Sequence, residues 1–270
     1  MKGWINGFLC VFSLCGFLVY QERDIPATRN TSYGVGEELE YRVHFGIFTV
    51  GKGTTRVDKN YHQINSRTCY KVDAYGETSD WISWVTKVRD NWGAYIDTTT
   101  LTTHRAYRKL LEGRHTRDEL VDFDHENDRV EVKTKNKDTG ALDSKTYNVP
   151  KNAKDLVAGF MFLRAIDFSK VATGDTLVIS GFHEDASYDL RIIYKGKEVV
   201  STRVGKIPCL RLTPIMPKNS MFDGENSVLC WISDDKNKIP VKLQAKMFIG
   251  NTGLELIRFR GLRNPLKIIF

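Results

Sequence analysis

The chain has 270 residues, of which 41% are hydrophobic and 27% are charged. These values are ordinary for a globular protein and argue against a mainly disordered chain. The length fits one large β domain, because sandwiches and barrels of this size are common as single units. The formal net charge of +7 is dispersed over segments such as 133–137 and 258–263, which is typical of solvent-facing strand positions. We therefore expect no nucleic-acid partner.

An apolar run over residues 3–20 follows Lys2 and precedes a charged segment. This pattern predicts a signal peptide or an N-terminal anchor, and membrane association through residues 3–20 follows if the leader is retained. Cys10 and Cys15 lack the small preceding residue of a lipoprotein signal, so lipid attachment and a plain apolar role both stay open. We expect an exported protein with a polar lead-in over residues 21–34.

Without residues 1–20, three cysteines remain: Cys69, Cys209 and Cys230. An odd number leaves at least one thiol without a disulfide partner inside the chain. Cys209 and Cys230 lie in strand-like segments and would pair only if those strands are neighbours. We favour buried, unpaired thiols and predict no metal site from them.

Strand-like alternation begins near residue 39, where every second residue up to 45 is hydrophobic, and a return strand follows. Gly46, Gly51 and Gly53 lie at this hairpin, but no lysine–serine or lysine–threonine pair opens a helix after them. We interpret them as glycines of a bend, a bulge or a close backbone approach, and not as a phosphate-binding loop.

Three tryptophans, Trp81, Trp84 and Trp92, lie within twelve residues. They could form a surface that stacks on sugars or contacts lipid, or they could pack in the core or at its rim. A hairpin is predicted over 119–133. Its alternating acidic residues lack the glycine and the distal glutamate of a calcium loop, so we interpret them as a solvated hairpin tip.

One helix is predicted, over about residues 153–166, from the i, i+4, i+7 spacing of the hydrophobic residues 156, 160 and 163. Asn152 precedes Asp155 with the spacing of an N-terminal cap. Gly159 inside the helix costs about 1 kcal/mol relative to alanine, which close packing against the sheet would offset. The helix is expected to cover an open sheet face or to close one end of a barrel.

After residue 174, strands are predicted over 176–182, 188–194, 199–204 and 209–213, with a tight turn at Lys195-Gly196. A hairpin follows over 228–243, and its polar turn contains Asp234 and Asp235. Adjacent strand residues face opposite sides, so these two acids do not fit a catalytic carboxylate pair. We interpret them as turn residues that accept backbone N–H bonds.

These elements predict a mainly β fold in which residues 35–270 form a single domain. The domain is expected to be a single curved antiparallel sheet or a half-open β-barrel with one main covering helix. Serine-hydrolase, zinc-protease, Cys-x-x-Cys and Walker motifs are absent from the sequence. His183-Glu184-Asp185 is interpreted as an exposed turn. We therefore expect a non-enzyme with no catalytic residues, no metal site and no cofactor.

Several ordered landmarks resemble an uncharacterised bacterial envelope family, the domain of unknown function 3108 (DUF3108). They are Tyr41-Arg42-Val43-His44-Phe45-Gly46 with Gly51, the helix from Leu156 to Arg164, Gly196-Lys197-Glu198, the Gly205 turn, and Trp231-Ile232-Ser233-Asp234-Asp235 before Ile239-Pro240-Val241. The similarity spans roughly residues 35–257. It implies a periplasmic or membrane-associated protein of a bacterial envelope and assigns no catalytic residue. By architectural analogy with envelope lipid and lipoprotein carriers, we expect a curved or half-open antiparallel barrel.

The favoured hypothesis is a non-catalytic envelope protein that binds a lipid, a lipoprotein acyl chain or another amphiphile in a curved sheet groove. The candidate ligand-binding residues are Trp81, Trp84, Phe160, Phe162 and Trp231, each of which could instead fill a closed core. One alternative is a structural or interaction module that binds an envelope protein or a glycan. A second alternative is a hydrolase that acts on envelope polymers.

Overall fold

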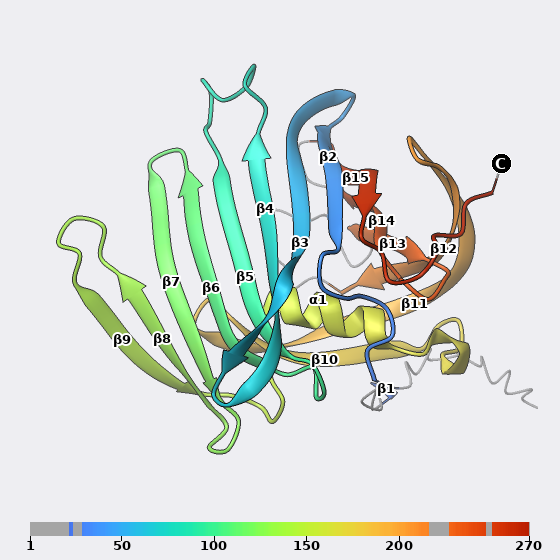
Figure 1. The fold of residues 1–270 in the computed structure, drawn as a ribbon. Helices are drawn as coiled ribbons and strands as arrows, with labels where there is room; N and C mark the ends of the chain where they lie inside the picture. Colours follow the sequence, from blue (N-terminus) through green and yellow to red (C-terminus); the bar gives the residue numbers. More distant parts are fainter. Residues whose placement is uncertain (1–21, 24–28, 216–226, 247–249, 270) are drawn as a thin grey trace, which may run out of the picture.

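The computed structural model describes residues 22–23, 29–215, 227–246 and 250–269. Within these ranges, fifteen strands form one sheet, and one α-helix lies inside its curve (Figure 1). The predicted leader, residues 1–20, lies outside them. No helix in the described part of the chain is both long and apolar enough to cross a membrane.

The strands follow the order β1-β10-β11-β12-β13-β14-β15-β2-β3-β4-β5-β6-β7-β8-β9. The short β1 pairs parallel with β10, and every other neighbouring pair is antiparallel. The strands are β1 (Glu22–Arg23), β2 (Glu38–Phe45), β3 (Phe48–Ile64), β4 (Arg67–Thr78), β5 (Arg89–Asp97), β6 (Thr103–Glu112), β7 (His115–Asp124), β8 (Arg129–Lys135), β9 (Leu142–Asn148), β10 (Thr176–His183), β11 (Ala186–Thr202), β12 (Gly205–Pro214), β13 (Val228–Ser233), β14 (Pro240–Lys246) and β15 (Asn251–Arg260).

The sheet curves strongly but is not closed into a barrel, because β1 and β9 stand at opposite ends of the strand order. Figure 1 shows β3 to β9 along one side of the helix and β11 to β15 curling on the other. The predicted single curved antiparallel sheet with one main helix is confirmed.

The predicted tight turn at Lys195-Gly196 is wrong. Residues 186–202 form one continuous strand, β11, whose register against β12 shifts between Tyr194 and Lys197. Gly196 has a φ of +95°, a conformation that glycine adopts at no steric cost. The glycine therefore marks a β-bulge that bends a long strand. The chain reverses at Arg203 and Val204 instead, because Thr202 pairs with Gly205.

The helix α1 (Leu156–Ala165) begins at Asp155, whose side chain accepts hydrogen bonds from the backbone N–H groups of Val157 (2.9 Å) and Ala158 (3.2 Å). These bonds satisfy donors that have no partner inside a helix. Just before the helix, Lys154 pairs with the edge of β10, where its N–H donates to the Ser180 carbonyl oxygen (3.1 Å). The chain thus enters the helix from a position fixed against the sheet.

The main core lies between α1 and the inner side of the sheet. It contains most of the helix and residues from β3, β4, β5, β10, β11, β12 and β13. A second cluster holds Trp231 and Cys209 with residues of β2, β14 and β15. Cys69, Cys209 and Cys230 are buried free thiols, which confirms the prediction of unpaired cysteines. Burial raises the pKa of Cys209 and Cys230 to about 12, so both stay protonated thiols at neutral pH.

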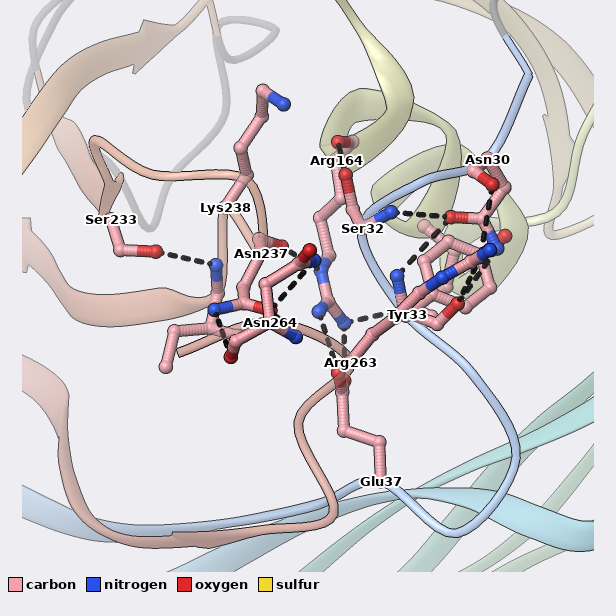
Figure 2. A network of polar contacts seen from close by, with 12 residues as sticks. Asn30, Ser32, Tyr33, Glu37, Arg164, Ser233, Asn237, Lys238, Arg263 and Asn264 are labelled. Atoms are coloured by element: carbon pink, nitrogen blue, oxygen red, sulfur yellow. Dashed lines mark hydrogen bonds and ion pairs between the residues drawn. The ribbon is translucent and has the colours of Figure 1, made fainter. Parts of the chain in front are cut away.

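A fully buried ion pair ties α1 to the start of the folded chain (Figure 2). The Arg164 guanidinium donates to both Glu37 carboxylate oxygens, from Nη1 at 2.6 Å and from Nη2 at 2.9 Å. Its Nε donates to the Asn237 carbonyl oxygen at 3.1 Å. Asn237 lies with Asp235 in the turn between β13 and β14, so the Arg164 side chain joins the helix, the segment that leads to β2 and the β13–β14 turn.

The described end of the polar lead-in, residues 29–34, is packed into this network rather than standing apart from the fold. Asn30, Ser32 and Tyr33 are buried, and the Ser32 hydroxyl donates to the Arg164 carbonyl oxygen at 2.6 Å. The sequence predicted a folded domain from residue 35, whereas tertiary packing begins by residue 30. Polar composition indicated a lead-in outside the domain, but the Asn30 and Ser32 side chains are hydrogen-bonded to buried backbone groups of the fold.

Candidate functional site

An apolar groove lies between α1 and the inner side of the sheet. Its volume is ≈ 350 Å³, which falls in the range of about 300–1,000 Å³ typical of ligand pockets. We call it the α1 groove. Its lining residues are Tyr41, Gly53, Thr54, Thr55, Ala74, Tyr75, Trp92, Leu156, Val157, Phe160, Met161, Cys230, Pro240, Leu243 and Leu254.

The floor of the α1 groove owes its space to small residues on neighbouring strands. Gly53 on β3 and Ala74 on β4 are two residues out of register, since Gly53 pairs with Gly76 and Thr55 with Ala74. A Cβ added at Gly53 would meet its nearest atom, the Tyr75 carbonyl oxygen, at 3.6 Å. No close backbone approach therefore requires glycine there, and a larger residue would extend into the groove.

One end of the α1 groove changes from apolar to charged across Trp92. The Arg108 guanidinium carbon lies 5.3 Å from the centre of the Trp92 ring, and the His183 ring centre lies 5.4 Å away. Arg108 donates from Nε to Glu119 Oε1 at 2.7 Å, while its buried Nη1 has no hydrogen-bond partner among the described residues. Glu184 approaches this Nη1 at 3.6 Å from an exposed turn. Next to the α1 groove, the Arg108 guanidinium thus has one buried N–H donor group, Nη1, without a hydrogen bond among the described residues.

Three titratable groups near this end have perturbed pKa values. Burial raises the pKa of Asp155 to about 6 and lowers that of Lys154 to about 8. Burial, together with the nearby Arg108 charge, lowers the pKa of His183, so its ring is neutral at pH 7. The Asp155 carboxylate is already occupied as the helix cap, accepting also from the Thr103 hydroxyl at 3.1 Å. The hydrogen bonds of Asp155 therefore stabilise the start of α1.

The five predicted ligand-binding residues lie in four different places. Phe160 lines the α1 groove. Phe162 is buried in the main core with the Lys154 amine 4.5 Å from its ring centre, and Trp231 is buried and donates from Nε1 to Glu198. Trp81 and Trp84 are exposed in the loop between β4 and β5. The structure brings only Phe160 to the groove, and a ligand-binding role for each of the five stays a prediction.

The sequence did not predict the other residues that line the α1 groove. Leu243 and Leu254 are paired across β14 and β15, and Leu254 is paired in turn with Val43 of β2. Their alternating pattern predicts half-buried strands but does not say which strand lies next to which. Trp92 is one of three tryptophans clustered in the sequence, but it lines the α1 groove, whereas Trp81 and Trp84 are exposed in the loop between β4 and β5.

The predicted turn role of Asp235 is confirmed. Its Oδ1 accepts hydrogen bonds from the N–H groups of Asn237 (2.8 Å) and Lys238 (3.3 Å), and its Oδ2 accepts from the Lys267 N–H at 3.1 Å. Asp234 pairs instead with Lys197 at 2.8 Å. No group of three or more His, Cys, Asp or Glu side chains in the described ranges is arranged to hold a metal ion.

Comparison with known proteins places the chain in a family. A family profile described as a protein of unknown function, DUF3108, matches residues 40–257. The chain belongs to this DUF3108 family. The match confirms the resemblance seen in the strand and helix landmarks. No curated protein sequence matches the chain.

Solved structures add information on the fold alone. A β-barrel-like protein of domain of unknown function DUF1849 from Brucella abortus has a TM-score of 0.54 at 10% identity, covering 85% of this chain and 98% of that chain. The hypothetical protein CT021 from Chlamydia trachomatis has a TM-score of 0.38 at 9% identity, covering 88% and 92%. A presumed lipoprotein from Parabacteroides distasonis has a TM-score of 0.36 at 11% identity, covering 88% and 100%. The first of these supports a barrel-like fold shared by proteins of very different sequence.

Proposed function

We propose that this DUF3108 protein is a non-catalytic protein of the bacterial envelope that binds the apolar part of an amphiphile in the α1 groove. The ligand class is a lipid or the acyl chain of a lipoprotein. One observation carries the proposal: an opening of ≈ 350 Å³ lined mainly by hydrophobic and aromatic side chains beside the helix. Ligand pockets are typically built in this way, with few polar groups among many apolar ones.

The energetics favour an acyl chain in such a groove. Each methylene group removed from water contributes about 0.8 kcal/mol, so a chain with about eight buried methylenes gains roughly 6 kcal/mol before the cost of association. Trp92 separates the apolar lining from Arg108, whose Nη1 is buried without a hydrogen-bond partner among the described residues. The polar end of the amphiphile is therefore assigned to the Arg108 side of the groove.

The proposed envelope location is supported by the apolar run at residues 3–20, which has the pattern of an export signal or anchor. Export would bring the groove to a compartment where acyl chains must cross water between membranes. A carrier or chaperone of amphiphiles shields such chains by burial. Membership of a family of unknown function assigns no activity, so the groove itself has to be tested.

Native mass spectrometry of the purified full chain, followed by lipid extraction, tests whether an amphiphile is bound. Affinity is then measured with a fluorescent dansyl fatty acid. Leu243 and Gln244 are adjacent and half-buried on β14, but only Leu243 lines the α1 groove. Leu243→Glu places a carboxylate in the groove and is expected to weaken probe binding at least tenfold. Gln244→Glu adds the same charge on the opposite side of the strand and is expected to leave binding unchanged.

Circular dichroism and thermal unfolding of both variants check that the fold is retained. Equal binding by the Leu243→Glu and Gln244→Glu variants would contradict the proposal, as would a wild-type protein that binds no probe. A ligand-free protein that instead captures an envelope protein or a glycan would favour an interaction module. Turnover of envelope-polymer fragments would favour a hydrolase.

A further inference from the structure

Five large hydrophobic side chains stand exposed at one end of the sheet, on two neighbouring loops. Ile47 and Phe48 are 90% and 59% exposed at the β2–β3 turn. Trp81, Trp84 and Val85 are 56%, 83% and 61% exposed in the loop between β4 and β5. We call these five residues the apolar tip. Figure 1 places both loops at the upper end of the sheet.

The two loops are held together as one surface. Trp81 Nε1 donates to the Thr49 carbonyl oxygen at 2.8 Å, and the ring centres of Phe48 and Trp81 are 6.4 Å apart. The Ser79 N–H donates to the Val50 carbonyl oxygen at 2.9 Å. The apolar tip is therefore a defined patch, and a contiguous exposed patch of this kind marks an interaction surface more often than scattered hydrophobic residues do.

Basic side chains stand directly behind the apolar tip. A cleft of ≈ 580 Å³ is bounded by Thr49, Ser79, Asp80 and Ser83 of the two loops. Its charged lining consists of five basic residues and two acidic residues: Arg42, Lys52, Lys87, Arg89, Arg203, Glu77 and Asp80. Arg42 is already paired with Glu255 at 3.0 Å and Lys52 with Glu77 at 2.5 Å. The positive charge that attracts anions therefore comes mainly from the exposed Lys87, Arg89 and Arg203, which we call the basic belt.

We propose that the apolar tip docks this protein on a lipid bilayer that carries anionic headgroups. Tryptophan prefers the boundary between hydrocarbon and headgroups, where its ring is apolar and its N–H can be hydrogen-bonded. The exposed Trp84 indole inserts at that boundary together with the other side chains of the apolar tip. The basic belt then meets lipid phosphates, which adds electrostatic attraction to the apolar burial. In an anionic bilayer, charged headgroups lie outside the hydrocarbon. The apolar tip with the basic belt behind it matches these two layers in chemistry and in order.

Docking through the apolar tip does not depend on the α1 groove, although it would orient the groove. Phe48 at the tip and Thr55 at the groove are seven residues apart on β3, about 23 Å at 3.3 Å per strand residue. A docked tip would thus hold the groove above the membrane surface. A protein whose groove binds nothing would still dock, so the two ideas fail separately.

Quenching of tryptophan fluorescence by brominated acyl chains tests the docking in the full chain. The chain has five tryptophans, and Trp4→Phe removes the one in the leader. The Trp4→Phe protein is reconstituted with vesicles of phosphatidylethanolamine and brominated phosphatidylglycerol. We expect strong quenching that is lost when Trp81 and Trp84 are also replaced by Phe, since Trp92 and Trp231 lie away from the tip. Equal quenching in both proteins, or none in the first, would overturn the proposal.

A second pair of variants keeps both reporter tryptophans. Ile47→Ser with Val85→Ser, in the Trp4→Phe background, is expected to reduce quenching at least threefold. Leu142→Ser on β9 is the matched control, because Leu142 is 70% exposed but lies outside the tip.

Quenching is also expected to fall when brominated phosphatidylcholine replaces the anionic lipid. Quenching unaffected by the tip variants would overturn insertion, and quenching equal on neutral vesicles would overturn the role of the basic belt. Absence of quenching together with tip-dependent capture of a protein would assign the surface to a protein partner instead.

Discussion

The buried pair between Arg164 and Glu37 gives a sharp prediction for stability. Both side chains are shielded from water, at 0% and 1% exposure, and join residues 127 positions apart. Replacing Arg164 by Met keeps much of the side-chain volume but leaves the Glu37 carboxylate without its partner. The Asn237 carbonyl oxygen loses a donor at the same time.

The expected cost is set by the buried charge that remains. Breaking a buried pair by removing one partner costs about 3–5 kcal/mol, whereas replacing both partners by apolar groups is often close to neutral. Arg164→Met should therefore lower the free energy of unfolding by about 3–5 kcal/mol, and adding Glu37→Leu should restore most of that loss. Urea unfolding followed by circular dichroism measures both.

An exposed ion pair supplies the control. Arg258 lies 3.7 Å from Glu40, and its side chain is 72% exposed. Arg258→Met is expected to cost less than about 1 kcal/mol, because exposed pairs are well solvated when separated. If Arg164→Met costs no more than Arg258→Met, or if the double variant with Glu37→Leu is the least stable of the series, the reasoning from burial is refuted.

Three further changes test local parts of the structure. Gly159→Ala is expected to raise the free energy of unfolding by about 1 kcal/mol, because an added Cβ meets a single atom at 3.9 Å and alanine is the better helix former; a loss of stability in urea unfolding would contradict this. Gly51→Ala is expected to lower it by about 1–3 kcal/mol, because the new Cβ would lie 2.5 Å from the Glu77 carbonyl oxygen, while Gly76→Ala has free space and serves as the control; equal effects in thermal unfolding would count against the close approach. Burial raises the pKa of Asp155 to about 6, against about 3.9 in an unfolded chain, so its contribution to stability is present below about pH 4 and lost as the pH rises through 6. The difference in unfolding free energy between wild type and Asp155→Asn should shift by up to about 3 kcal/mol between pH 4 and pH 7 in urea titrations, and a difference independent of pH would show that the carboxyl has an ordinary pKa.

The sequence carried enough local information for the general fold. Alternating hydrophobic residues located most strands, and the i, i+4, i+7 spacing located the start of α1 within three residues and its end within one. Gly196 illustrates the limit of such patterns. The same glycine fits a tight turn or a bulge, and the choice depends on whether β12 continues to pair beyond it, which is a tertiary property.

Long-range contacts explain what the sequence did not reveal. Arg164 lies in an otherwise apolar helix, and its partner Glu37 is identifiable only once the chain is folded. Phe160 was a groove candidate because its helix was predicted, whereas Leu243 and Leu254 reach the groove through pairings of β14, β15 and β2. Register between distant strands is set by the whole sheet and cannot be deduced from one strand.

Photoaffinity labelling with a fatty acid that carries a diazirine near its methyl end tests the proposed ligand site most directly. Crosslinked peptides are mapped by mass spectrometry after irradiation of the full chain. An acyl chain in the α1 groove predicts labels on α1 residues 156–161 and on β14 residues 240–243, both reduced by unlabelled fatty acid. Labels confined to the apolar tip, or labels that unlabelled fatty acid does not reduce, would contradict binding in the groove.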